Sequence, residues 1–125
     1  MKFVIILTLV GLTMAKLGEW NAMANDGHKA IELAKKGVAH YNLNSKSFYY
    51  RKLVDIKSAK SKTDNGATYE IIFEIDMSNC LKTKPYSEEC KVQTELLTEE
   101  CTYVFYSAPK SDECEIVKGS CIPLN

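Results

Sequence analysis

The chain has 125 residues, of which 16 are basic and 16 acidic, so its formal net charge at pH 7 is zero. This balance provides no basic excess for nucleic-acid binding and no acidic tail. The length predicts a single folded domain.

The first 15 residues are predicted to form a secretory signal peptide. Lys2 supplies a short positive region, residues 3–12 are an apolar run, and Thr13-Met14-Ala15 provides small residues at a cleavage site. The apolar run is too short to span a bilayer. We therefore expect a secreted, extracellular domain over residues 16–125, with no membrane attachment after cleavage.

An extended arm and one helix are predicted next. Residues 16–24 show no clear period and indicate an arm. Asn25 or Asp26 is a candidate N-cap for a helix that runs to about Tyr41. Gly37 weakens this helix, which indicates close packing at that point. Apolar residues at helical spacing form one stripe, consisting of Ala30, Ile31, Ala34, Val38 and Tyr41.

From Phe48 onward the apolar pattern changes to the period of two that is typical of strands. In the first predicted strand Phe48, Tyr50, Val54 and Ile56 would share a face, and Asn65-Gly66 then predicts a hairpin turn. The second strand alternates most clearly, with Tyr69, Ile71, Phe73, Ile75 and Met77 on one face. Further strands are predicted at about 91–97, 101–107 and 113–118. The fold class is therefore α+β, with one helix and an antiparallel sheet of four or five strands.

Four of the five cysteines fall into two spacings. Cys80 and Cys90 are ten residues apart, and Cys101 and Cys121 are twenty apart. In a short exported chain we interpret these spacings as two disulfides rather than as a metal site. Cys114 is left over, and it is expected either as a buried thiol or as the link of an intermolecular dimer.

Several segments together resemble the cystatin family, in particular its secreted members with two disulfides. They are the helix end Val38-Ala39-His40-Tyr41-Asn42, the strand segment Tyr69-Glu70-Ile71-Ile72-Phe73, and both cysteine spacings. The resemblance covers nearly all of residues 16–125. It implies a cystatin-like fold in which one long helix is wrapped by a curved antiparallel sheet.

The resemblance also implies a function, namely inhibition of papain-like cysteine proteases. Cystatins insert an N-terminal arm and two hairpin loops into the protease cleft without forming a covalent bond. Here Leu17-Gly18 corresponds to the arm with its hinge glycine, Gly66 to the first loop and Pro109 to the second. Trp20 follows the hinge, either as an interface anchor or as a packed structural residue.

Both loops depart from the family pattern. The family's Gln-x-Val-x-Gly falls on residues 62–66, where only Gly66 matches and Asp64 replaces the valine. The family's Pro-Trp falls on Pro109-Lys110, which lacks the tryptophan. We therefore expect weak inhibition, because a carboxylate is costly to desolvate and lysine does not replace an aromatic anchor. One alternative is a cystatin-fold binding or signalling module without inhibition, and another is inhibition of a different protease class.

No other chemistry is indicated. His28 and His40 lie too far apart on the predicted helix to share a metal, and no paired carboxylates, phosphate loop or Ser/His/Asp arrangement stands out. The segment Ser45-Lys46-Ser47 has lysine where legumain-binding cystatins need asparagine. We expect a protein that is not an enzyme and that uses no cofactor or metal.

Overall fold

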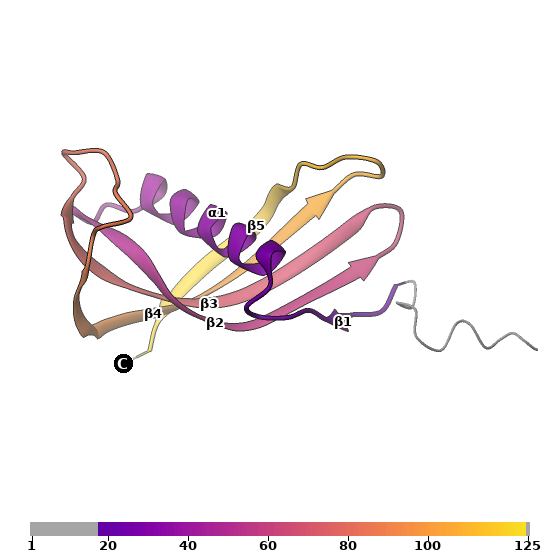
Figure 1. Ribbon diagram of the computed structural model, residues 1–125, viewed down its shortest axis with the longest axis horizontal. Helices are drawn as coiled ribbons and strands as arrows, with labels where there is room; N and C mark the ends of the chain where they lie inside the picture. The colour runs from indigo at the N-terminus through magenta and orange to yellow at the C-terminus, as the bar shows by residue number, and fades with distance from the viewer. Residues whose placement is uncertain (1–17, 125) are drawn as a thin grey trace, which may run out of the picture.

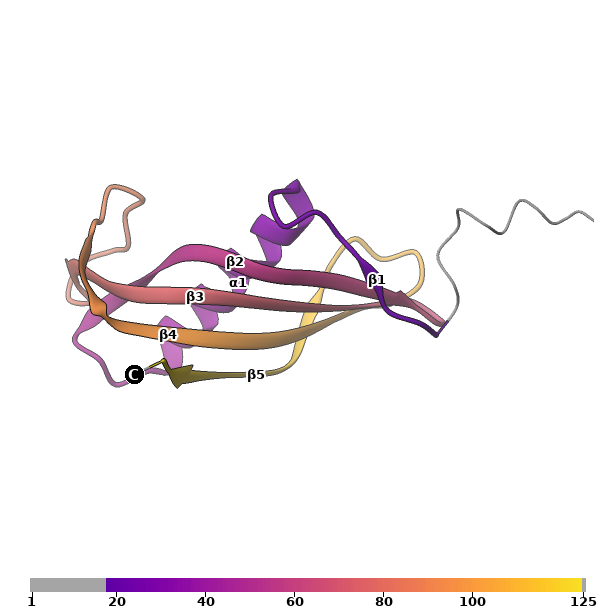
Figure 2. The ribbon, with the colours of Figure 1, turned by 90° about the horizontal axis from the view of Figure 1, so that it is seen from below.

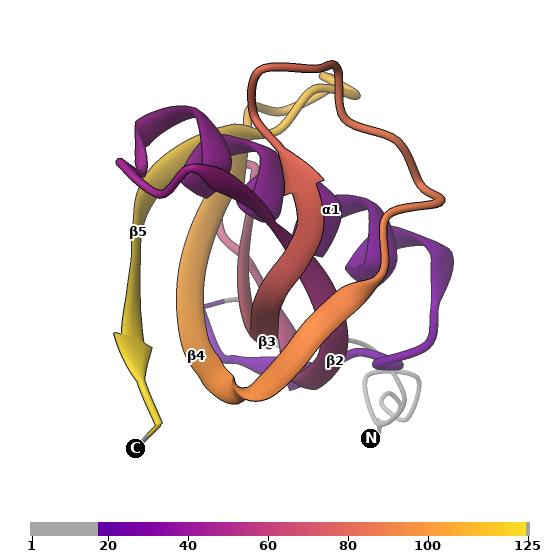
Figure 3. The same cartoon turned by 90° about the vertical axis from the view of Figure 1, so that its left-hand side faces the viewer.

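The computed structural model describes residues 18–124, apart from the side chains of residues 94–96. One helix lies across a curved, five-stranded antiparallel sheet (Figures 1 and 3). The elements in chain order are β1 (Asn21–Ala22), α1 (His28–Asn44), β2 (Tyr49–Thr63), β3 (Ala67–Leu81), β4 (Val92–Ser107) and β5 (Glu115–Pro123). The predicted signal peptide and Leu17 lie outside the described residues. Within residues 18–124, no helix has the length and apolarity needed to cross a membrane.

The strands follow one another across the sheet in chain order, from β1 to β5. Figure 2 shows β2, β3 and β4 side by side, with β1 at one edge of the sheet and β5 at the other. This arrangement confirms the predicted α+β class and the meander of antiparallel strands. Strands β2 to β5 are neighbours because hairpin connections favour antiparallel pairing, whereas α1 lies between β1 and β2 in the chain.

The helix begins later and ends later than predicted. Its N-cap is Gly27, without a side-chain hydrogen bond, so the prediction of Asn25 or Asp26 as the cap was wrong. The Asn25 amide instead donates to the carbonyls of Ile56 and Lys57 at 3.3 and 3.2 Å. The Asn25 side chain, which the local sequence predicts as a helix cap, thus hydrogen-bonds the edge of β2 instead.

The helix packs on the sheet through a stripe of mostly small residues. Ala30, Ala34 and Val38 are buried as predicted, and Leu33, which the predicted stripe omitted, is 1% exposed. At Gly37 an added Cβ would lie 2.8 Å from Cζ of Phe73. This distance confirms that the glycine allows close approach of helix and sheet.

Strand β2 does not keep the predicted two-residue period. Phe48 precedes the strand and is 82% exposed, and Val54 is 42% exposed, whereas Leu53 packs against the core. Register shifts between Leu53 and Asp55 and between Ile56 and Ser58 explain the difference. Each irregularity inserts a residue and changes which side chains face inward. The predicted shared face of Phe48, Tyr50, Val54 and Ile56 was therefore wrong.

The alternation predicted for β3 is confirmed at its centre, where Ile71, Phe73 and Ile75 are fully buried. A register shift then follows between Ile75 and Met77. The segments 91–97 and 101–107 form one continuous strand, β4, rather than two. Strand β5 begins at Glu115 and continues beyond residue 118 to Pro123.

The outer edge of β2 is covered by three different groups. Asn42 on the helix donates to the Arg51 carbonyl at 3.0 Å and accepts from its N–H at 2.7 Å. Asn25 binds the carbonyls of residues 56 and 57. Strand β1 then pairs with Lys60 and Ser61.

Two disulfides fix the C-terminal half of the chain. Cys101 and Cys121 are cross-strand partners on β4 and β5, and Cys80 joins Cys90 across the connection between β3 and β4. Cys114 is a free thiol that is 6% exposed. The ammonium group of Lys36 on the helix donates to the Cys114 carbonyl.

Candidate functional site

Three segments that are distant in sequence meet at one end of the sheet. They are the arm at Gly18, the β2–β3 turn at residues 64–66 and the β4–β5 connection at residues 108–111, and we call them together the hairpin edge. They lie toward the right-hand end of the molecule in Figure 1, and the β3–β4 connection lies at the opposite end.

The arm is attached directly to the first hairpin. The Gly18 N–H donates to the Thr63 carbonyl at 3.0 Å. Gly18 has a φ of 78°, which favours glycine, and a Cβ placed there would meet no atom within 4 Å. The backbone conformation, and not a lack of space for a side chain, therefore favours glycine at this position.

The two hairpins are held against each other at the edge. Ala67 pairs with Ser107, and the Tyr106 hydroxyl donates to the Asn65 carbonyl at 2.8 Å. Gly66 has a φ of 108°, and a Cβ there would lie 2.6 Å from the Ser107 carbonyl oxygen. Glycine at this position satisfies both the predicted turn and the contact between hairpins, of which only the turn was evident from sequence.

The tips of the hairpin edge are polar. Asp64 and Asn65 are exposed on the first tip, and Pro109 and Lys110 are exposed on the second. Lys110 has a φ of 66°, a left-handed conformation that is uncommon for residues other than glycine. The edge thus presents one carboxylate and one ammonium group beside turn backbone.

Trp20 lies on the flank of the arm, beside β2. Its side chain is 40% exposed, and the ammonium groups of Lys60 and Lys62 lie 4.9 and 5.0 Å from its ring. Contacts of this kind are worth about 0.5–1 kcal/mol at exposed sites. They hold the ring against the basic strand and leave two fifths of it accessible.

The structure therefore brings Gly18, Gly66 and Pro109 to one edge and places Trp20 beside it. Comparison with known proteins gives this edge its context. The cystatin domain model matches residues 18–110 of the 125. The chain belongs to the cystatin family.

Two curated cystatins illustrate the relationship in sequence. Cystatin-1 of Chilobrachys guangxiensis is 28% identical over 123 residues, which cover 95% of this chain and 92% of the relative. Human cystatin-SN is also 28% identical, over 109 residues that cover 83% of this chain and 75% of the relative. Members of this family are protease inhibitors rather than enzymes.

Solved cystatin structures share the fold. Dimeric human cystatin F superposes with a TM-score of 0.76 at 19% identity, covering 91% of this chain and 94% of that one. Mialostatin, a gut cystatin from the tick Ixodes ricinus, gives a TM-score of 0.68 at 20% identity, covering 86% of this chain and all of that one. At these identities the likeness establishes the helix-on-sheet architecture.

Proposed function

We propose that this cystatin is a secreted inhibitor of papain-like cysteine proteases that inserts its hairpin edge into the protease cleft. The observation that carries the proposal is the convergence of Gly18, Gly66 and Pro109 at one end of the sheet. The Gly18–Thr63 hydrogen bond and the Ala67–Ser107 pair connect the three segments. An edge built in this way is preorganised, so little conformational entropy is lost on binding.

We further propose that the inhibition is weak. Asp64 and Lys110 occupy exposed tip positions, and a cleft deep enough to hold the edge would desolvate both. Burying an unpaired charge costs several kcal/mol, and each 1.4 kcal/mol weakens binding tenfold. Less binding free energy would be lost with a target protease whose cleft has groups that pair with these two charges.

Titration of residues 16–125 against papain and cathepsins L, B and C tests this function. We expect inhibition at micromolar concentration. The variant Gly18→Ala should weaken it at least tenfold, because alanine is strained at a φ of 78° and would redirect the arm. Ser120→Ala, at an exposed position on β5, is the matched control and should inhibit as the parent does.

The rival function is a cystatin-fold binding or signalling module without inhibition. Complete absence of inhibition at micromolar protein, with a folded circular dichroism spectrum, would refute the inhibitor proposal and favour this module. Inhibition that is unaffected by Gly18→Ala would place the contact outside the hairpin edge.

A further inference from the structure

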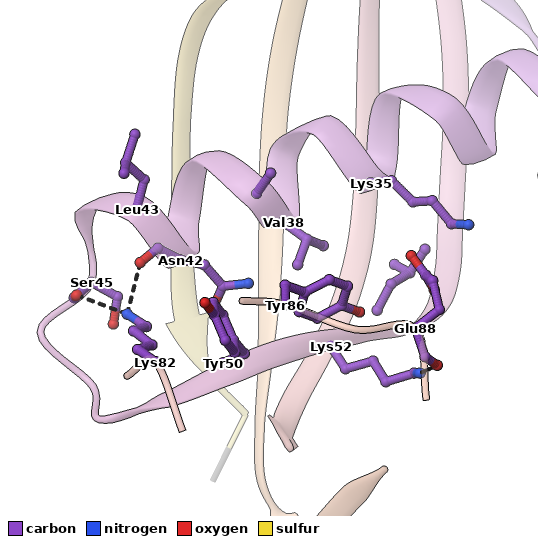
Figure 4. Close-up of a pocket in the computed structure, with 12 residues that line it drawn as sticks. Lys35, Val38, Asn42, Leu43, Ser45, Tyr50, Lys52, Lys82, Tyr86 and Glu88 are labelled. Carbon is purple, nitrogen blue, oxygen red and sulfur yellow. Dashed lines mark hydrogen bonds between the residues drawn. The ribbon is translucent and has the colours of Figure 1, made fainter. Parts of the chain in front are cut away.

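A cavity lies between the C-terminal half of α1, the start of β2 and the β3–β4 connection (Figure 4). Its volume is about 610 Å³, within the range of roughly 300–1,000 Å³ that is common for small-molecule sites. It lies toward the end of the molecule opposite to the hairpin edge (Figure 1). The proposed protease contact therefore does not account for it.

The middle of the cavity is apolar. Val38 and Leu53 form part of its lining, and the rings of Tyr50 and Tyr86 meet edge to face with centroids 5.3 Å apart. The Tyr50 hydroxyl donates to the Lys84 carbonyl at 2.6 Å, which holds the ring beneath the β3–β4 connection. A hydrocarbon chain or an aromatic ring would find apolar contacts there.

Two lysines on the cavity wall are held in place by backbone carbonyls. The Lys82 ammonium donates to the carbonyls of Asn42 and Ser45 at 2.7 and 3.0 Å. The Lys52 ammonium donates to the carbonyls of Glu88 and Cys90 at 2.9 and 2.7 Å. An ammonium group has three N–H donors, so each lysine retains one for a ligand.

The lining of the cavity carries a net positive charge. Three lysines line it, Lys35, Lys52 and Lys82, and Glu88 is the one acidic residue in the lining. Among the side chains that the structure describes, no carboxylate lies within 4.0 Å of any of these three ammonium groups. In Figure 4, Glu88 lies near Lys35 and Lys52, whereas Lys82 lies at the other end, beyond Tyr50.

The surroundings of Lys82 also disfavour its positive charge. Burial, and then the positive charge of Arg51, lower the pKa of Lys82 below its ordinary value. Arg51 is itself already paired with Glu99 at 3.0 Å. An anion beside Lys82 would therefore offset the repulsion between Lys82 and Arg51.

We propose that this cavity binds a single-chain amphiphile with one carboxylate, of the medium-chain fatty-acid class. The carboxylate accepts the remaining N–H of Lys82, and the hydrocarbon tail lies over Val38, Leu53 and the two tyrosine rings. Charge complementarity determines the head group, and the apolar lining determines the tail. This ligand site is independent of the proposed protease inhibition.

Calorimetry with residues 16–125 and decanoate, held below its micelle concentration, tests the site. We expect saturable one-to-one binding, with amide shift changes in ¹H–¹⁵N spectra at Val38, Tyr50, Leu53 and Tyr86. Octanoate should bind up to about 15-fold more weakly, since each buried methylene contributes about 0.8 kcal/mol. Acetate lacks the tail and decyltrimethylammonium carries the opposite charge, so neither should bind. Equal binding of decanoate and decyltrimethylammonium would overturn the proposal.

Substitutions at two positions of the cavity locate the ligand. Lys82→Met should weaken decanoate binding at least tenfold and Lys82→Arg should restore part of it, whereas Lys46→Met, the same change at an exposed position outside the cavity, should have no effect. Ala39→Trp fills the cavity from an exposed helix position and should abolish binding without disturbing the core. If Lys82→Met fails to fold, Ala39→Trp decides. Decanoate binding that survives Ala39→Trp would refute the site.

Discussion

Gly119 on β5 lies against the ring of its cross-strand partner Tyr103 on β4. A Cβ at position 119 would stand 2.5 Å from Cζ of that ring and nearer still to two other ring carbons. Tyr103 is 2% exposed, and its hydroxyl lies 2.9 Å from Nδ1 of His40 on the helix. The missing side chain of Gly119 thus allows an aromatic residue to connect the sheet with the helix.

Gly119→Ala should therefore destabilise the fold. The ring cannot move without leaving His40 or overlapping its neighbours, so we expect a loss of about 1–3 kcal/mol in the free energy of unfolding. Denaturant unfolding measures this loss. Ser120→Ala, the adjacent exposed position, is the control and should stay within about 0.5 kcal/mol of the parent. Equal stability of the two variants would contradict the proposed contact.

Gly37→Ala sets helix propensity against packing. At an exposed helix position, alanine is about 1 kcal/mol more favourable than glycine. Here the new methyl group would meet Cζ of Phe73 at 2.8 Å and Cγ of Tyr103 at 3.3 Å. We expect overpacking to prevail, with a net loss of about 1–2 kcal/mol in thermal or denaturant unfolding. The loss should shrink in a Phe73→Leu background, and a stabilised Gly37→Ala variant would refute the packing argument.

Sequence alone predicted the elements whose pattern is local. The central alternation of β3 and the Asn65–Gly66 turn needed only period and turn chemistry, and both are present. The inward face of β2 was not predictable, because irregularities in its pairing with β3 place Leu53 inside and Val54 outside. Asn25 was predicted as a cap of the helix because the sheet edge that it binds is distant in sequence.

In the candidate site too, contacts between segments that are distant in sequence were not predicted. Gly66 and Pro109 were named as site residues from the resemblance to the cystatin loops, but the hydrogen bond from the Tyr106 hydroxyl to the Asn65 carbonyl had no sequence signal. The cavity was missed altogether. Its lysines carry no motif, and they become a group only because the helix, β2 and the β3–β4 connection meet there.

Replacing Glu99 should show how much a nearly buried ion pair contributes to the stability of the fold. Its carboxylate lies 3.0 Å from Arg51 and accepts the Tyr41 hydroxyl at 2.9 Å, and the two charged side chains are only 11% and 14% exposed. Glu99→Gln leaves the guanidinium unpaired, so we expect a loss of about 3 kcal/mol on unfolding. Tyr41→Phe should cost about 1 kcal/mol.

The double variant Arg51→Met/Glu99→Leu separates pairing from packing. It removes both charges from a nearly dry site, and it should be more stable than Glu99→Gln alone. A double variant that is less stable than the single one would show that the pair contributes more than its desolvation costs.

The thiol of Cys114 should be protected in the folded protein. Because the residue is 6% exposed, we expect slow reaction with a thiol reagent under native conditions and complete reaction in guanidinium chloride. Non-reducing gels should show a monomer. Rapid labelling of the Cys114 thiol under native conditions would contradict its buried position. A covalent dimer that a reducing agent converts to monomer would contradict it as well.

The loop tips should limit inhibition if the proposed function holds. Asp64→Val and Lys110→Trp restore the apolar residues of the family pattern, and each should strengthen papain inhibition at least tenfold. The Asp64 N–H bonds the Gly66 carbonyl at 3.0 Å through backbone alone, so the first turn should survive the change. Asp112→Val removes an equal charge from an exposed residue next to the second tip and should leave inhibition unchanged.

The covering of the outer β2 edge has a consequence for self-association. Asn42, Asn25 and β1 together occupy backbone groups at residues 51, 56, 57, 60 and 61. Another chain therefore cannot extend the sheet from this side without displacing them. Strand β5, at the opposite edge, has no such cover among the described residues and exposes Val117 and Ile122. Fibril growth or strand-to-strand dimerisation of the folded protein would start from β5.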